Sequence, residues 1–159
     1  MKNKLLSLLL LLFLVAANSL SEDEDDTVLS ITEERKRTLS FGIDSEIEPL
    51  LADITEEKNS NFVEEVTILF EASLNTDIRI DCIEYMLAIE DTSLLENAEE
   101  ILQEFEDYPV QLVKTSISYI SNLRETVDLE KITPLIEADA AVAAAAIQNF
   151  SQLDVDGLS

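Results

Sequence analysis

The residues available for chemistry are many acids and few other reactive groups. The 159-residue sequence contains 34 Asp and Glu, ten Lys and Arg, one Cys and no His. The commonest general base near neutral pH is therefore missing, and Ser-His-Asp and Cys-His arrangements are excluded. The two glycines, Gly42 and Gly157, are too few for a glycine-rich phosphate loop. We expect no enzymatic activity, no catalytic residue and no cofactor, although chance carboxylate pairs stay open as an acid–base device.

Two acidic segments have the composition of cation sites. Asp154-Val-Asp-Gly157 resembles half of a calcium loop, but the sequence ends before the bidentate Glu that completes such a loop. We interpret it as a turn that ends a helix and leads toward a further repeat. The acidic run at 22–26 is interpreted as solvated linker rather than as a loose cation site. We therefore expect no metal site.

The lone cysteine and the charge of the chain limit other functions. Cys82 lies among apolar residues at helical spacing, which favours a buried structural thiol over a redox or intermolecular role. The formal net charge is −24, so the surface repels phosphate backbones and anionic lipids. We expect no nucleic-acid binding and interpret the charge as a solvated acidic surface that keeps the protein soluble. A protein partner with a basic surface is the alternative. The basic cluster Arg35-Lys36-Arg37 is interpreted as forming local ion pairs.

Residues 1–19 have the pattern of a secretory signal peptide. A basic start precedes an apolar run at 5–17, and Ala17-Asn-Ser19 supplies small residues for cleavage after Ser19. The run is shorter than the roughly 20 residues that span a bilayer. We expect export to the periplasm or another extracytoplasmic space, with no membrane span after cleavage. An uncleaved N-terminal anchor is the alternative.

The remaining sequence predicts an acidic disordered linker at 20–29 and an all-α domain at 30–159 with about seven to eight helices. Capping patterns at Ser30-x-x-Glu33 and Ser45-x-x-Glu48 predict two helix starts, and Gly42 predicts a helix end. Apolar residues at helical spacing predict further helices at about 62–74, 76–89, 93–105, 109–123, 129–137 and 140–153. The helix at 76–89 is apolar on two faces, which predicts packing between neighbours.

A weak internal repeat links the second helices of successive pairs. Ile83 and Ile117 are 34 positions apart within similar segments, and Ile147 follows 30 positions later. A period of about 30–35 residues with two helices per unit is typical of an α-solenoid of antiparallel helix pairs. We predict that Ile83 and Ile117 are equivalent core residues. Because the helix at 140–150 is the least polar, we also expect it to be covered in the native state, either by a partner or by further repeats if the chain is a fragment of a longer solenoid. Alanine that only supplies helix propensity and tolerates exposure is the alternative.

Several short motifs resemble HEAT repeats. They are Asp77-Ile-Arg79 and Asp139-Ala-Ala-Val142 at helix starts, with Pro49-Leu-Leu51 and Pro134-Leu-Ile136 in preceding helices. The segment 37–47 further resembles a junction in exported HEAT-repeat proteins of spirochaete-type bacteria. The resemblance covers about residues 31–155. It implies a scaffold with a binding surface rather than a catalyst.

We therefore expect an exported HEAT-like scaffold that binds a protein partner on its inner row of second helices. An accessory or assembly subunit of a cell-envelope enzyme or outer-membrane complex is the alternative. A cation buffer would be supported by charge alone. The candidate partner-binding residues are Arg79, Asp81, Glu84, Gln111, Lys114 and Gln148.

Overall fold

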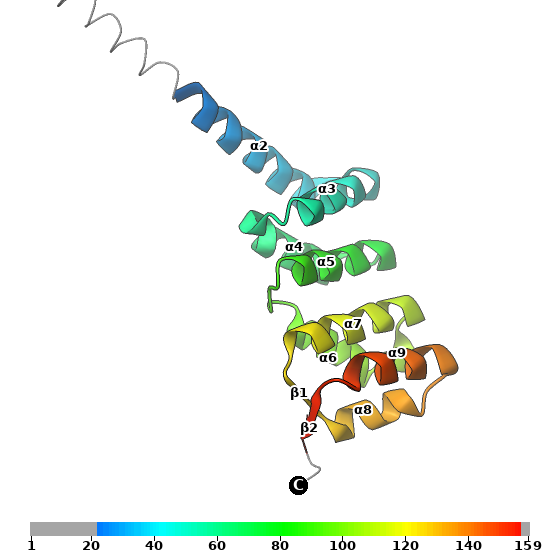
Figure 1. The fold of residues 1–159 in the computed structure, drawn as a ribbon. Coiled ribbons are helices and arrows are strands. Elements are labelled where there is room, and N and C mark those ends of the chain that lie inside the picture. Colours follow the sequence, from blue (N-terminus) through cyan, green and yellow to red (C-terminus); the bar gives the residue numbers. More distant parts are fainter. Residues whose placement is uncertain (1–21, 157–159) are drawn as a thin grey trace, which may run out of the picture. The chain divides into compact units, whose positions relative to one another are not determined.

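The computed structural model describes residues 22–156, and these are almost entirely helical (Figure 1). The chain forms two units, residues 1–38 and 39–159. The predicted all-α class is confirmed. The predicted signal peptide and its cleavage site lie outside the described residues. Within the described part, no helix is both long and apolar enough to cross a membrane.

Helix α2 (Glu22–Phe41) contains the described part of the first unit. It includes residues 22–29, which the sequence assigns to a disordered linker, and it continues through Ser30 without a break. The prediction that Ser30 starts a helix is therefore wrong. Acidic residues favour the first turn of a helix because they interact well with its dipole, so the acidic run is compatible with an earlier start. The helix ends directly before Gly42, as predicted.

The second unit contains seven more α-helices among its described residues, and their bounds lie close to the predicted ones. The order is α3 (Asp44–Glu56), η1 (Ser60–Phe62), α4 (Val63–Ala72), α5 (Thr76–Ala88), α6 (Leu95–Gln103), η2 (Phe105–Asp107), α7 (Val110–Leu123), β1 (Thr126–Asp128), α8 (Leu129–Ile136), α9 (Ala140–Phe150) and β2 (Asp154–Asp156).

Side-chain caps mark the starts of three of these seven α-helices, namely α5, α8 and α9. Asn75 Oδ1 accepts a hydrogen bond from the Asp77 amide at 3.0 Å, and Asp139 Oδ1 accepts one from the Ala141 amide at 2.8 Å. Helix α3 differs from the prediction, because its start is capped at Ile43 rather than at Ser45. The Ile43 amide donates to the Glu46 carboxylate at 3.2 Å. The predicted Ser45-x-x-Glu48 box is therefore two residues too late.

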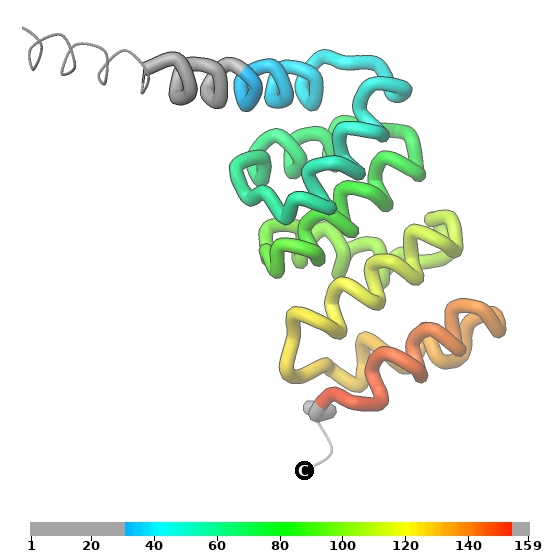
Figure 2. Tube along the Cα trace, turned by 45° about the horizontal axis from the view of Figure 1, so that its top comes forward, coloured from blue at the N-terminus to red at the C-terminus, as the bar shows by residue number. Residues whose placement is uncertain are grey.

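The helices of the second unit stack in pairs, as Figures 1 and 2 show. Helices α3, α5, α7 and α9 form one row in which each packs against the next, while α4, α6 and α8 pack against α5, α7 and α9 respectively. Helix α5 lies between α3 and α7, which confirms the packing predicted from its two apolar faces. Ile83 and Ile117 are both fully buried, as predicted.

Two buried tyrosines make the same contact in successive helix pairs. Tyr85 of α5 donates to the Asn59 carbonyl at 2.7 Å, and Tyr119 of α7 donates to the Asp91 carbonyl at 2.6 Å. Each hydroxyl thus holds the loop that precedes the first helix of its own pair. The two tyrosines are also equivalent in the predicted repeat, so α5 and α7 share a register. In α9 the equivalent position is Asn149, which accepts a hydrogen bond from Ser121.

A short parallel strand pair was not predicted. Strand β1 follows α7, strand β2 follows α9, and Val127 is paired with Val155. The predicted turn at Asp154-Val-Asp-Gly157 is therefore wrong for residues 154–156. Local patterns could not show this pairing, because its two strands are separated by the whole α8–α9 pair.

The apolar residues of α9 divide between two faces. Val142 and Ala146 are buried within the chain itself, whereas Ala141 and Ala144 are exposed and Ile147 is 55% exposed. Covering of α9 by its own chain is thus only partial. Ile147 is repeat-equivalent to the buried Ile117, and it is exposed because no described helix packs on that side of α9.

Candidate functional site

Four of the six predicted partner-binding residues line one groove. Its volume is about 570 Å³, and it runs across α5, α7 and α9. The row of these helices brings together side chains that are far apart in the sequence. We call it the central groove, and its lining residues are Glu84, Leu87, Gln111, Lys114, Thr115, Ser118, Ala141, Ala144, Ala145, Gln148 and Asn149.

The polar side chains of the central groove are largely without partners. Among the described residues, no hydrogen bond or ion pair is formed by six of these side chains, those of Glu84, Gln111, Lys114, Thr115, Ser118 and Gln148. Thr115 is only 8% exposed overall, but its hydroxyl oxygen is not fully buried and can be reached from the groove. Asn149 differs, because its amide donates to the Ala145 carbonyl at 2.8 Å. Polar groups that are unpaired on one surface are available to an incoming ligand.

Sequence reasoning missed the two hydroxyl residues of the groove. Thr115 and Ser118 lie four and seven positions after Gln111, so they share one face of α7. That spacing could have identified them. They were missed because Thr and Ser at helical spacing do not differ visibly from other weakly polar helix residues.

Asp81 lies beside the groove in a row of acids, which we call the acidic strip. The strip consists of Glu48 on α3 with Asp77, Asp81 and Glu84 on α5. Desolvation by burial raises the pKa of Asp81 to about 6, and repulsion from the other three carboxylates adds to the rise. The carboxylates on this face therefore repel one another, and a cationic ligand would reduce that repulsion.

Replacing Asp81 by Asn is expected to stabilise the protein at pH 7. An acid whose pKa is raised by folding contributes stability below its unfolded pKa near 4, and this is lost as the pH rises through about 6. Solvent screening at this partly exposed site limits the expected gain to about 1 kcal/mol. Urea unfolding at pH 4 and pH 7 measures it. The gain in stability should vanish at pH 4. As a control, Asp53→Asn at an exposed position on α3 should give no gain. Equal gains from both variants would contradict the burial and repulsion described for Asp81.

Arg79 does not line the central groove. Its guanidinium carbon lies 4.6 Å from the centroid of the Phe70 ring and 5.4 Å from that of Tyr108. Such cation–π contacts join α5 to α4 and to the segment before α7. Arg79 thus has a packing role in this structure and is separated from the other candidates.

Cys82 is a free, fully buried thiol, as predicted. Burial raises the pKa of this thiol far above its ordinary value, with Asp81 adding to the rise. A thiol that stays protonated is a poor nucleophile and a poor metal ligand. Its environment is therefore that of a packing residue.

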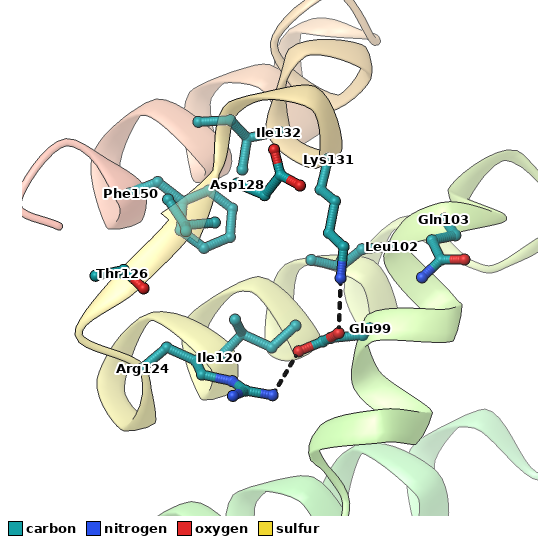
Figure 3. A pocket seen from close by; sticks show the side chains of 11 residues that line it. Glu99, Leu102, Gln103, Ile120, Arg124, Thr126, Asp128, Lys131, Ile132 and Phe150 are labelled. Carbon is teal, nitrogen blue, oxygen red and sulfur yellow. Dashed lines mark hydrogen bonds and ion pairs between the residues drawn. The ribbon is translucent and has the colours of Figure 1, made fainter. Parts of the chain in front are cut away.

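A second cavity of about 250 Å³ lies between α6, the end of α7, β1, α8 and the end of α9 (Figure 3). Glu99 of α6 accepts from Arg124 at 2.7 Å and from Lys131 at 3.0 Å. Figure 3 shows both cations converging on this carboxylate. Apolar side chains line much of the remaining wall, namely Leu102, Ile120, Val127, Ile132 and Phe150.

The ion pairs of Glu99 connect α6 to the residue that follows α7 and to α8. Burial alone would raise the pKa of Glu99, but hydrogen bonding and attraction from Lys131 and Arg124 outweigh it and lower the pKa. Both cations are thereby occupied by a group of the same chain. Lys114 of the central groove has no such partner among the described residues, and we regard the cavity as the secondary candidate.

The described residues contain no group of three or more His, Cys, Asp and Glu side chains arranged to hold a metal ion. In comparisons with known proteins, no family model, no curated protein and no solved structure matches this chain. The function is therefore argued from the geometry of the central groove and the acidic strip.

Proposed function

We propose that this protein is an exported, non-catalytic interaction module, built as a HEAT-like α-solenoid, which binds a protein partner across α5, α7 and α9. The stacking of helix pairs supports the solenoid. The repeated tyrosine contacts of Tyr85 and Tyr119 support a common repeat unit. Export is supported by the pattern of residues 1–19 and the absence of catalysis by the lack of histidine.

The observation that carries the proposal is the set of unpaired polar side chains in the central groove. Most of these side chains are exposed or half-buried, so water is their partner in the free protein and a ligand can replace it. Here one cation, one carboxylate, two amides and two hydroxyls converge without partners of their own among the described residues. A surface of this kind gains more from binding a complementary polar partner than a surface whose groups are already paired.

Site-specific photo-crosslinking in intact cells of the source organism tests the proposal. A benzophenone amino acid is placed at Gln111 or Gln148 in the groove and, as a control, at the exposed Glu100 of α6. We expect one discrete adduct from each groove position and none from Glu100. Fractionation of the same cells tests the export.

The outcomes separate the parts of the proposal. Adducts only from Glu100 would mean that a partner binds elsewhere than in the groove. Absence of any protein adduct, from every position, would contradict an interaction function. Recovery of the protein in the cytosolic fraction, with residues 1–19 intact, would contradict export.

A further inference from the structure

We propose that the central groove binds an extended peptide segment of the partner, whose main chain pairs with the groove side chains and whose basic side chain lies over the acidic strip. This inference deepens the proposed function and rests on it. It assigns the ligand a backbone conformation, a charge and an approximate length.

The types of unpaired groups point to a polypeptide main chain. Gln111 and Gln148 each offer an amide donor and an amide acceptor, and the hydroxyls of Thr115 and Ser118 can do either. An extended chain presents N–H and C=O groups that lack internal partners, and such groups bind well to a surface with mixed donors and acceptors. A helical ligand already satisfies its main chain internally, so it would leave this mixture unused.

Thr115 is the most specific part of the groove. Its side chain is 8% exposed and lines the groove, and it has no hydrogen-bond partner among the described residues. The Thr115 hydroxyl oxygen is not fully buried, so it can be reached from the groove and is hydrated in the free protein. A main-chain group of the ligand can replace that water as its hydrogen-bond partner.

The α9 side of the groove allows a main chain to approach closely. Ala141, Ala144 and Ala145 line this side, and each carries no side-chain atom beyond Cβ. Small side chains let two backbones come together, as they do between closely packed helices. Helix α7 packs directly against α9, so one ligand can touch both this wall and the polar side chains of α7.

The charges around the groove determine where the charged groups of the ligand are expected to lie. The acidic strip, Glu48, Asp77, Asp81 and Glu84, lies on the α3–α5 side of the groove, and Lys114 lies on α7. A lysine or arginine of the ligand is therefore expected over α5, with a carbonyl or carboxylate near Lys114. Because packed helices lie 8–10 Å apart and an extended chain advances about 3.3 Å per residue, about six residues span α5 to α9.

Selection from a phage-displayed library of random nonapeptides tests the inference on the full chain. We expect enriched peptides to carry Lys or Arg. For a synthetic enriched peptide, Glu84→Gln should weaken binding about fivefold and Thr115→Val about tenfold. The matched controls are Glu100→Gln on α6 and Thr133→Val on α8, where the hydroxyl already donates to the Leu129 carbonyl. Both controls should bind as the parent does.

The conformation of the bound peptide is measured by transferred nuclear Overhauser effects. Strong sequential contacts between Hα and the next amide proton indicate an extended chain, as we expect. Amide-to-amide contacts typical of a helix would overturn the inference. So would enrichment of acidic peptides, or equal weakening by the groove variants and their controls.

Failure of this inference is distinct from failure of the proposed function. If no peptide is enriched while the groove positions crosslink to a partner in cells, the partner binds there as a folded surface, and the extended ligand is excluded. If neither experiment yields binding, the interaction function itself is contradicted. Thr115→Val should leave the urea midpoint unchanged, which separates lost binding from lost folding.

Discussion

Replacing Ile117 by Ala is expected to lower the free energy of unfolding by about 2–5 kcal/mol. Ile117 is fully buried in α7, which packs against α5, α6 and α9, so truncation leaves a cavity that several helices would have to move to fill. Ile83→Ala on α5 should cost a similar amount, because it occupies the equivalent buried position. Urea unfolding, monitored by circular dichroism, measures the free energy of unfolding of both variants and of Glu84→Ala.

Glu84 follows Ile83 directly and is exposed, which makes it the control for position in the helix. Its replacement by Ala should change the free energy of unfolding by less than about 0.5 kcal/mol. Small and equal effects at Ile83, Ile117 and Glu84 would show that the repeat register of α5 and α7 is wrong. A large effect at only one isoleucine would limit the error to the other helix.

Replacing Ala146 by Asp is expected to unfold the α8–α9 pair or to cost more than about 3 kcal/mol. Ala146 is fully buried on α9, so the new carboxylate would lose its hydration without gaining a partner. Its effect on the end of the unit is measured by hydrogen exchange of the α8 and α9 amides, together with urea unfolding of the whole chain.

The exposed Ala144 on the same helix provides the matched control. Ala144→Asp loses the same intrinsic helix propensity, about 0.6 kcal/mol, but places its charge in water. The difference between the two variants therefore reports burial alone. Equal effects would contradict the orientation of α9, in which Ala146 faces the chain and Ala144 faces the groove.

Local patterns in the sequence predicted most of the helices. The two apolar faces of α5 predicted its position between neighbours, because a side chain's direction on a helix follows from its spacing alone. The starts of α5 and α9 agree with the predicted positions, and the structure adds that Asn75 and Asp139 cap them. The equivalence of Ile83 and Ile117 was visible as well, because repeated helices need repeated core residues.

Other features were decided by contacts between residues far apart in the sequence. Residues of β1 and β2 pair across an entire helix pair, and no local pattern marks either one as a strand. Ile117 and Ile147 occupy equivalent positions, but α9 packs against α7 while no described helix covers Ile147. The difference in their burial thus depends on neighbours and not on residue type.

The candidate site also depends partly on local sequence patterns and partly on contacts between distant residues. Periodicity placed Glu84, Gln111, Lys114 and Gln148 on second helices, but only the packing of α5, α7 and α9 joined them into one groove. Packing also added Thr115, which lines the groove and has no hydrogen-bond partner among the described residues. It removed Arg79, whose long side chain reaches the rings of Phe70 and Tyr108. The sequence alone determined which helices form and the charge they carry, because those depend on nearby residues and composition. The tertiary structure decided which polar groups are left without partners, because a partner can come from anywhere in the chain.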